Sequence, residues 1–598
     1  MIHFIFSEQD RRYLFLKCDS EEDEIWLASN KKHANLTDHL NLVDPICYLA
    51  TYTGPHFTQD FLYKYNQPSG QTVYYCSIGL WQEIYNFFKT NNVPFDGLLD
   101  HQYFFKRNIQ HSFEEFKQIV DSWGLDRTPR PYQYEAAYKI LQWNQSVSGL
   151  ATRAGKTLIA YIIFRYCIEH LGAKRILMIV PSIQLVTQGY NDFNEYAEFF
   201  KTECVWGGGK LVESANLTIG TFQSLIKFLE RPTKSKKNDK YNPAFFNGYD
   251  IVFVDETHRA TANQIKTIIS QPFMKDVKIA FGMTGTIPPK HTIDYYCLKS
   301  LLGATIQEIK PKYLMDEGYI SKVNITQIHL HYKDINKQRI NFIKCAEYAL
   351  SEFATEERIN RNGKTVKEKI KLSKPEFQIQ YVKELPMGIN ELRLQIYNEK
   401  DASTYANWIN SLMAYIKMST ATNLLVIERM LAHFMTERVD FLCNELLEIC
   451  DKNTLILAHH TEYINYITEI IKKKFPNRHI DVITGSVSPK KREQIKQMLK
   501  DNNDCILIAS YGTLSTGITL ANLCFGVLFE SFKSEVINMQ SIGRGLGLSD
   551  LKDEFVLYDI IDCFEKKVIS NKIYLQGLAK QKIYDKEQYP YKVIHKNI

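Results

Sequence analysis

The sequence predicts an α/β protein that contains two successive domains, each built on a parallel β-sheet. In two regions, short runs of apolar and β-branched residues alternate with longer amphipathic helical patterns. Runs that are apolar throughout are typical of strands buried on both faces, and helices between such strands favour parallel βαβ connections. A chain of 598 residues is long enough for roughly three to five domains with sizeable cores.

The first parallel-sheet domain is predicted at 126–320 and the second at 441–570. The expected strands of the first are RILMIVP (175–181), ANLTIG (215–220), DIVFVDE (250–256) and KIAFGMTG (278–285). Those of the second are NTLILAHH (453–460), HIDVITG (479–485), DCILIAS (504–510), FGVLFES (525–531) and FVLYDII (555–561).

The rest of the chain has a different character. Residues 1–125 are rich in aromatic residues and contain short strand-like runs and the helical pattern LWQEIYNFFKTNN, which together predict a small α+β domain. Residues 321–440 are charged and mostly helical in pattern, so we expect a linker and a mainly helical insert there. Within it, Asn362-Gly363 fits a hairpin turn, and a charged loop fits the same segment equally well. Residues 571–598 are expected to be a C-terminal tail.

Composition excludes several classes of protein. Apolar residues make up 45% and charged residues 23%, which is ordinary for a soluble globular chain. A net charge of +6 is only mildly basic, so a nucleic-acid surface has to be local, and a solvated surface explains the charge as well. The twelve cysteines form no C-x-x-C pair, which argues against a zinc or redox motif. No signal peptide and no apolar run of about 18 residues is present, so we expect a cytoplasmic protein without a membrane partner.

A phosphate-binding loop is predicted at ATRAGKT (151–157), which is followed at once by the apolar helical pattern LIAYIIFRY. Glycine lets the backbone wrap closely round phosphates, and the helix N-terminus holds negative charge. Lys156 would reach the β and γ phosphates of ATP, and Thr157 would ligate Mg²⁺. Leu150 stands where the first glycine of the usual pattern belongs, and a Gly-Lys-Thr turn alone is compatible with a purely structural role.

A pair of acids supports the nucleotide-binding interpretation. In IVFVDETH, Asp255 and Glu256 end a predicted buried strand about a hundred residues after the lysine loop. One acid at a strand end is unremarkable, whereas two acids followed by Thr257 and His258 are hard to explain structurally. Asp255 would hold Mg²⁺ and Glu256 would orient and deprotonate the attacking water. The two motifs together predict an enzyme that hydrolyses Mg-ATP.

These motifs resemble motifs I and II of the superfamily 2 helicases, whose fold is two tandem RecA-like domains. Arg130-Pro131-Tyr132-Gln133 resembles the Q motif, in which Gln133 would read the adenine edge, although alone it would be taken for a turn. Thr284-Gly285-Thr286 resembles motif III, which links the state of the nucleotide to the track. The resemblance implies a nucleotide site made by Tyr132, Gln133, Thr152, Arg153, Ala154, Gly155, Lys156, Thr157 and Gly517.

The same resemblance implies nucleic-acid contacts in both domains. In the first they are carried by VPSIQLVTQ and GTFQS, and in the second by ITGS and ASYGTLSTGI, for which a polar loop between strand and helix is the alternative. The implied contact residues are Pro181, Gln184, Thr221, Gln223, Thr484, Gly485, Ser510, Thr513 and Thr516.

The segment QSIGRGLG (540–547) resembles motif VI, in which arginines reach the γ-phosphate and stabilise the transition state. Gln540 and Arg544 match that pattern, but Gly547 stands where its final arginine belongs. Three alternatives stay open: Arg544 acts alone, a nearby basic residue substitutes, or turnover is low. We favour the first.

Several stretches, among them VPSIQLVTQGYNDF and SYGTLSTGITLANL, resemble the UvsW-type helicases of T-even bacteriophages, apart from a segment near 340–425. This resemblance implies an ATP-dependent helicase that acts on branched DNA or RNA–DNA hybrids in replication, recombination and repair, in the host cytoplasm if the chain is viral. One alternative is a translocase or transcript-release factor that does not unwind. Another is a nucleotide-gated nucleic-acid-binding protein with impaired hydrolysis.

Overall fold

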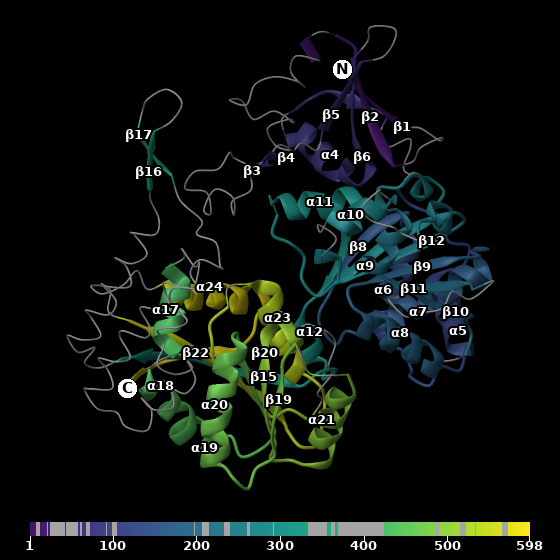
Figure 1. Cartoon of the computed structure of the whole chain (residues 1–598). Helices are drawn as coiled ribbons and strands as arrows, with labels where there is room; N and C mark the ends of the chain where they lie inside the picture. Colours follow the sequence, from purple (N-terminus) through teal and green to yellow (C-terminus); the bar gives the residue numbers. More distant parts are fainter. Residues whose placement is uncertain are drawn as a thin grey trace. The chain divides into compact units, whose positions relative to one another are not determined.

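The computed structural model divides the chain into two compact units, Met1–Lys310 and Pro311–Ile598 (Figure 1). The structure describes residues 1–6, 12–20, 22–23, 42–43, 58–59, 62–66, 72–90, 92–97, 105–196, 198–205, 215–232, 240–259, 263–290, 292–332, 356–359, 365–368, 424–433, 435–485, 487, 489–514, 522–532, 534–564 and 572–598.

The first unit contains a seven-stranded parallel sheet in the order β10-β11-β9-β12-β13-β8-β14. The strands are β8 (Gln145–Leu150), β9 (Ile176–Val180), β10 (Thr202–Val205), β11 (Leu217–Thr221), β12 (Ile251–Asp255), β13 (Ile279–Thr284) and β14 (Ala304–Ile309). All four predicted strands are present, and β9, β11 and β13 are buried along their whole length, as continuous apolar runs predict. The strands β8, β10 and β14 were not predicted, because serine, threonine and glutamate interrupt their apolar pattern.

The main helices beside this sheet alternate with its strands along the chain, beginning with α6 before β8. They are α6 (Pro131–Leu141), α7 (Lys156–His170), α8 (Ile183–Tyr196), α9 (Phe222–Leu225), α10 (Asn263–Ile269) and α11 (Ile293–Leu302). Helix α5 (Phe113–Ser122) begins with a capping box of Ser112 and Glu115 and contacts α6.

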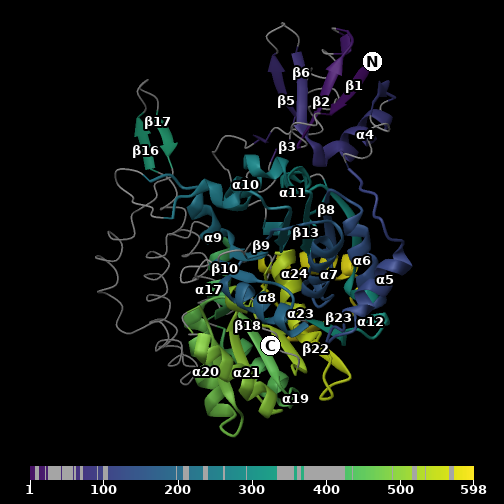
Figure 2. The same cartoon turned by 90° about the vertical axis from the view of Figure 1, so that its right-hand side faces the viewer.

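A smaller sheet lies at the start of the chain, in the order β5-β6-β2-β1-β7. Its strands are β1 (Ile2–Phe6), β2 (Tyr13–Cys18), β5 (Leu62–Asn66), β6 (Thr72–Ser77) and β7 (Phe95–Asp96), and a separate pair joins β3 (Leu42–Val43) to β4 (Thr58–Gln59). The short turn η1 (Ile78–Leu80) leads into α4 (Trp81–Thr90), and η1 contacts α11, so the small sheet lies beside the first parallel-sheet domain (Figure 2). The predicted α+β character of the N-terminal region is confirmed.

The second unit contains another seven-stranded parallel sheet, in the order β19-β20-β18-β21-β22-β15-β23. Its strands are β15 (Lys322–His331), β18 (Thr454–Ala458), β19 (Ile480–Ile483), β20 (Ile506–Ser510), β21 (Phe525–Leu528), β22 (Glu554–Cys563) and β23 (Tyr591–Asn597). Its helices are α12 (Pro311–Asp316), α17 (Leu424–His433), α18 (Thr436–Phe441), α19 (Leu447–Ile449), α20 (Thr461–Lys474), α21 (Pro489–Asp501), α22 (Tyr511–Leu514), α23 (Glu535–Gly545) and α24 (Lys572–Glu587), with a π-helical segment at Leu442–Leu446.

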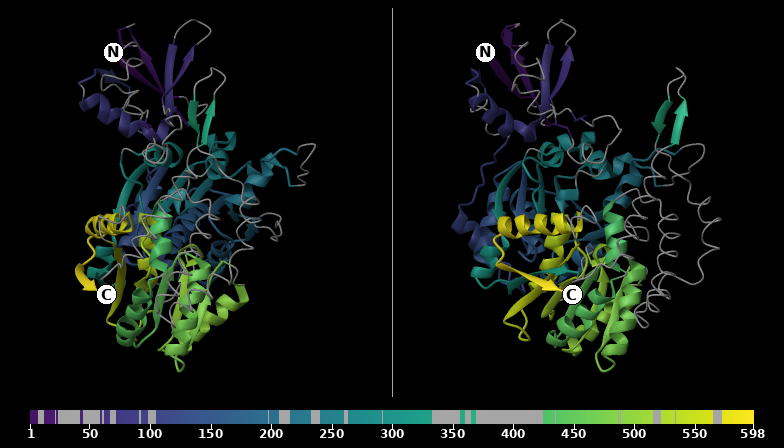
Figure 3. Two further views of the ribbon diagram at one scale, coloured as in Figure 1. Left: turned by 60° about the vertical axis from the view of Figure 1, so that its left-hand side comes forward. Right: turned by 90° about the vertical axis from the view of Figure 1, so that its left-hand side faces the viewer.

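Two expectations about the second unit are wrong. Residues 322–331 were expected in a mostly helical linker and 591–597 in a tail, but they form β15 and β23, and β23 ends the chain at the sheet edge (Figure 3). The reason is a buried polar network: Gln327 of β15 donates to Asp559 of β22 (2.9 Å), and Asp559 also pairs with Lys580. Polar residues that hydrogen-bond to one another inside a sheet interrupt the apolar run by which a buried strand is predicted from the sequence.

The insert is described only in part. Strands β16 (Glu356–Ile359) and β17 (Thr365–Glu368) pair antiparallel, with Ile359 opposite Thr365, which confirms the hairpin alternative over the charged loop. Asn362-Gly363 and most of the predicted insert lie outside the described residues. No helix in the described part of the chain is long and apolar enough to cross a membrane.

Candidate nucleotide and nucleic-acid sites

The carboxyl ends of three neighbouring strands bring the predicted nucleotide-binding residues together. The loop 151–155 follows β8, Asp255 ends β12 and Thr284 ends β13. In the sheet register Asp255 lies beside Met283, and Thr284 lies beside Gly149. The carboxyl edge of a parallel sheet is where α/β proteins bind their ligands.

The phosphate-binding loop requires glycine at position 155. Gly155 is the N-cap of α7 and has φ 77°, in the left-handed region that favours glycine. A Cβ atom there would lie 2.1 Å from Nε2 of Gln133, so even a methyl group has no room. The loop is therefore shaped both by its own backbone and by the Q-motif side chain beside it.

Two of the predicted nucleotide-binding residues, Tyr132 and Gln133, bind the same carbonyl group of the loop. The hydroxyl of Tyr132 and Nε2 of Gln133 donate to the Ala154 carbonyl oxygen, at 2.8 and 2.9 Å. Oε1 of Gln133 accepts from the Arg130 backbone N–H (2.8 Å), and both side chains are buried. The structure thus joins the Q motif to motif I, a contact that the spacing of the motifs did not indicate.

The cationic end of Lys156 lies between the loop and the acids. Its Nζ atom is 3.4 Å from the carbonyl oxygen of Leu150 and 3.8 Å from Oε1 of Glu256. Leu150, which replaces the first glycine of the usual motif, is fully buried at the end of β8, so its side chain serves the core. Beside it, Arg153 has φ 70°, and burial lowers the pKa of its guanidinium to about 10.

The two adjacent acids, Asp255 and Glu256, disfavour each other's ionisation. Burial of the Asp255 carboxyl group and the charge of Glu256 raise the pKa of Asp255 to about 7, while Lys156 opposes that shift. The Glu256 backbone N–H donates to Oδ1 of Asp255 (2.9 Å), and Glu256 itself has φ 50°. A non-glycine residue in this region is a sign of local strain, which is common at functional sites.

The donors available here suit Mg²⁺. Asp255 offers a carboxylate and Thr157 a hydroxyl at the start of α7, and both are hard oxygen ligands. A cation would relieve the raised pKa of Asp255, because a nearby positive charge favours the ionised carboxylate. The described residues hold no cluster of three or more His, Cys, Asp or Glu side chains able to bind a metal.

His258 is a site residue whose contacts sequence reasoning missed. It lies in η5 (Thr257–Arg259), with its side chain 8% exposed, and its Nδ1 atom is 2.8 Å from the Thr284 hydroxyl and 3.3 Å from Oε2 of Glu256. The Thr284 hydroxyl also accepts from the Thr286 backbone N–H (3.2 Å). Side-chain contacts through His258 therefore connect Glu256 of motif II to Thr284 of motif III.

The predicted nucleic-acid residues of the first unit lie at the same sheet edge, on its other half. Pro181 follows β9 and Thr221 ends β11, and these strands are neighbours, with Val180 beside Thr221. Thr221 is buried and its hydroxyl accepts from the Ser224 backbone N–H (3.3 Å), so it caps α9. Gln223 is exposed, so it is the better placed of the two polar residues to meet a ligand.

In the second unit, Thr484 and Gly485 follow β19, and Ser510 ends the neighbouring strand β20. Gly485 is exposed, whereas Thr484 is buried. Thr516 and Gly517, and the side chain of Thr513, lie outside the described residues, so their predicted roles stay predictions.

Motif VI forms the end of α23. Arg544 lies half-buried in the last turn, and Oε1 of Gln540 is buried without a hydrogen-bond partner in the described part of the chain. The Gly547 carbonyl accepts from the hydroxyl of Ser321 (2.7 Å), which ties the end of the motif to the start of β15. The Lys552 ammonium donates to the carbonyls of Gly545 and Leu523, and so it caps α23.

Comparison with known families follows the same division into two domains. Residues 126–289 match the family model described as type III restriction enzyme, res subunit, and residues 437–546 match that of the helicase conserved C-terminal domain. These two matches, on the two parallel sheets, indicate a superfamily 2 ATP-dependent helicase with two tandem RecA-like domains.

Among individual proteins, the chain is similar to the ATP-dependent DNA helicase uvsW of Enterobacteria phage T4. The two are 25% identical over 459 residues, which cover 75% of this chain and 72% of the relative. The crystal structure of T4 UvsW aligns with 100% of this chain and 99% of its own, at 18% identity and a TM-score of 0.39. S. cerevisiae Dbp5 bound to RNA and ADP BeF3 aligns with 81% of this chain and 95% of its own, at 12% identity and a TM-score of 0.44.

Proposed function

We propose that this helicase hydrolyses Mg-ATP at the carboxyl edge of its first sheet and unwinds branched DNA or RNA–DNA hybrids during replication, recombination and repair. The observation that carries the proposal is the shared edge: Lys156 and Glu256 lie 3.8 Å apart there, and the loops after β9 and β11 belong to the same edge. The similarity of the chain to a DNA helicase supports DNA as the nucleic acid along which it moves.

The residues of the nucleotide site divide the work. Gly155 and the N-terminus of α7 receive the phosphates, and Lys156 neutralises the β and γ phosphates. Glu256 orients the attacking water and takes its proton. Thr157 and Asp255 would hold Mg²⁺, whose charge would offset that of the phosphates. His258 positions Glu256 and passes a change in its position to Thr284.

The protein binds the nucleic acid mainly through its phosphate groups. Gln223 and Gly485 follow strands and Ser510 ends one, all at the carboxyl edges of their sheets, and they suit hydrogen bonds to a sugar-phosphate backbone. Affinity should therefore fall steeply as salt rises, and preference for base sequence should be weak.

Two other functions use the same core. A translocase that does not unwind is favoured by the match of residues 126–289 to a restriction-enzyme subunit. A nucleotide-gated binding protein is favoured by Gly547, which replaces the final arginine of motif VI. A strand-displacement assay separates the first from a helicase, and ATP hydrolysis separates the second.

The decisive experiment measures ATP hydrolysis with no DNA and with single-stranded, duplex and forked DNA. Lys156→Ala is the blank, and Lys174→Ala, which removes an exposed lysine just before β9, at the opposite edge of the sheet from the loop, is its matched control. Stimulation that is greatest with forks and is lost only in Lys156→Ala supports a branched-DNA motor. Hydrolysis that no DNA stimulates contradicts the proposal.

A further inference from the structure

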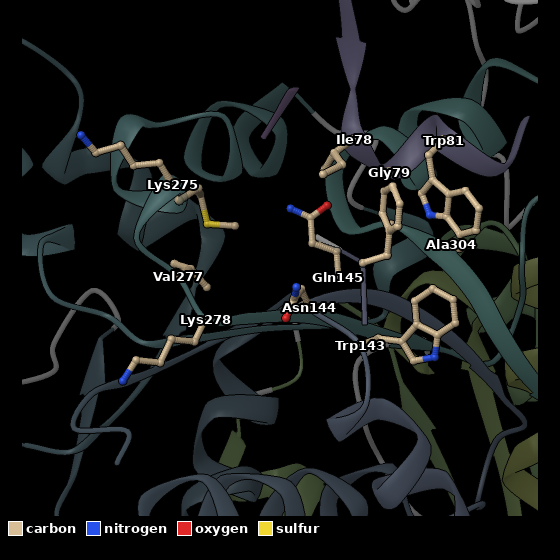
Figure 4. Close-up of a pocket in the computed structure, with 13 residues that line it drawn as sticks. Ile78, Gly79, Trp81, Trp143, Asn144, Gln145, Lys275, Val277, Lys278 and Ala304 are labelled. Atoms are coloured by element: carbon tan, nitrogen blue, oxygen red, sulfur yellow. The ribbon is translucent and has the colours of Figure 1, made fainter. Parts of the chain in front are cut away.

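A hollow in the first unit lies at the opposite edge of the sheet from the nucleotide loop. It holds about 530 Å³ of empty space, part of it open to solvent, between η1 and α4 on one side and the starts of β8, β13 and β14 on the other. The side chains that matter below are Trp81, Phe105, Trp143, Gln145, Lys275 and Lys278 (Figure 4).

One side of the hollow is aromatic. The ring of Trp81 stacks on Phe105 with centroids 4.5 Å apart and planes at 25°, and Lys106 lies over the ring of Trp143 at 5.3 Å. Both indole groups are only partly buried, and Figure 4 shows them on the same side of the hollow. Partly exposed, well-supported aromatic rings are suitable stacking platforms for a flat ligand.

The hollow also contains an unsatisfied polar group. Oε1 of Gln145 is buried and has no hydrogen-bond partner among the described residues. A buried acceptor without a donor costs free energy, which a ligand N–H group would recover. Figure 4 places the Gln145 side chain between the indole groups and the lysines.

The side opposite the indole groups is basic. Lys275 is exposed, and Lys278 lies near it and pairs with Asp250 at 2.9 Å. Both lysine side chains extend outward from the hollow in Figure 4. A phosphate at the mouth would therefore meet Lys275 first, because the charge of Lys278 is already partly neutralised.

We propose that this hollow binds one unpaired nucleobase together with its phosphate. The base stacks on the indole side, a base N–H group donates to Gln145, and Lys275 contacts the phosphate. The inference rests on the proposed function only in naming a nucleic-acid strand as the source of the base, since a free nucleotide offers the same chemistry. Because the hollow and the motif loops lie at opposite sheet edges, the base bound here is not one of the nucleotides that the motif loops contact.

The test is photo-cross-linking of the full chain to an oligonucleotide that carries 5-iodouracil, followed by mass spectrometry of the modified peptides. Cross-links at Trp81 or Trp143 are expected, and an abasic competitor strand of equal length should not suppress them. Gln145→Leu and Lys275→Glu should each lower the yield at these tryptophans about tenfold, the loss expected for one hydrogen bond or one charged contact. Lys201→Glu makes the same charge reversal at an exposed position on the same sheet edge, before β10 at the far end of the sheet from β14, and should not.

The outcomes separate this proposal from the proposed function. If forked DNA stimulates ATP hydrolysis but neither tryptophan is cross-linked, the base site is overturned and the motor stands. If the tryptophans are cross-linked without stimulated hydrolysis, the base site stands and the motor fails. If the natural ligand is a free nucleotide, deoxyadenosine monophosphate abolishes the cross-link at a concentration equal to that of the oligonucleotide; if the ligand is a strand, only a large molar excess does so. Melting temperatures near that of the wild type show that the variants are folded.

Discussion

Nδ1 of His258 lies 2.8 Å from the hydroxyl group of Thr284, so motif II and motif III are joined by a side-chain hydrogen bond in the first unit. The same nitrogen is 3.3 Å from Oε2 of Glu256. A change in the position of Glu256 during hydrolysis therefore has a direct route to the loop that follows β13.

Replacing Thr284 by valine should break this route. The variant leaves buried polar groups unpaired, so the free energy of unfolding should fall by about 1–3 kcal/mol. DNA-stimulated hydrolysis should fall more than hydrolysis without DNA, because the coupling is lost. Thr284→Ser keeps the hydroxyl group and is the control, and equal loss of both activities in Thr284→Val would count against coupling.

The pKa of Asp255 predicts an unusual pH dependence. The folded protein raises this pKa from its ordinary range to about 7, so between about pH 4 and 7 the folded state binds more protons than the unfolded state. Stability without nucleotide should therefore decrease as the pH rises through this window. Asp255→Asn should remove the decrease and stabilise the protein at pH 8 by on the order of 2 kcal/mol. Urea unfolding at pH 5 and 8 measures this, with the exposed Asp276→Asn as the control.

The double role of Gln133 can be separated with two nucleotides. Its side chain holds the Ala154 carbonyl at 2.9 Å, and its predicted role is to read the adenine edge. Gln133→Ala should lower ATP hydrolysis about tenfold, the loss expected for one hydrogen bond to a buried partner. If Gln133 reads adenine, the preference for ATP over GTP should also disappear. An unchanged preference would mean that Gln133 only supports the loop.

Arg544 is predicted to be the residue that stabilises the transition state. Arg544→Ala should lower kcat by about a thousandfold or more, the usual effect of removing an arginine finger. Lys552, which caps α23, tests the alternative that a nearby basic residue substitutes. Lys552→Ala should lower the melting temperature. A thousandfold loss of kcat in Lys552→Ala with an unchanged melting temperature would assign the role to Lys552.

The hairpin of β16 and β17 is predicted to act as a wedge between strands. Its strands contain charged residues, with Glu357 opposite Lys367 in the register, and in sequence they lie between the two parallel-sheet domains. Replacing residues 355–373 by a short Gly-Ser linker should abolish strand displacement and keep DNA-stimulated hydrolysis. Unchanged strand displacement would rule out the wedge.

A structural feature of this protein can be predicted from the sequence when it depends on residues that are close together in the chain. The strands β9, β12, β18 and β20 were predicted because their apolar runs are continuous, and burial on both faces requires that pattern. Lys156, Asp255 and Glu256 were predicted because the chemistry of phosphate and Mg²⁺ restricts which residues follow a strand. The resemblance to superfamily 2 helicases rested on these motifs in order and is confirmed.

Other features depend on contacts between residues far apart in the chain. β15 was missed because its polar residues are satisfied by Asp559, which lies more than two hundred residues later. The bond between His258 and Thr284, the grip of Gln133 on Ala154 and the capping role of Thr221 also left no pattern in the sequence.

The sequence by itself therefore determined the two-domain α/β class and the residues that carry the chemistry, because apolar periodicity and phosphate-binding loops are local. Only the tertiary structure decided which side chains meet, because strand order in a sheet is set by packing over the whole domain. That order places β12, β13 and β8 side by side and so makes one site from three separate loops.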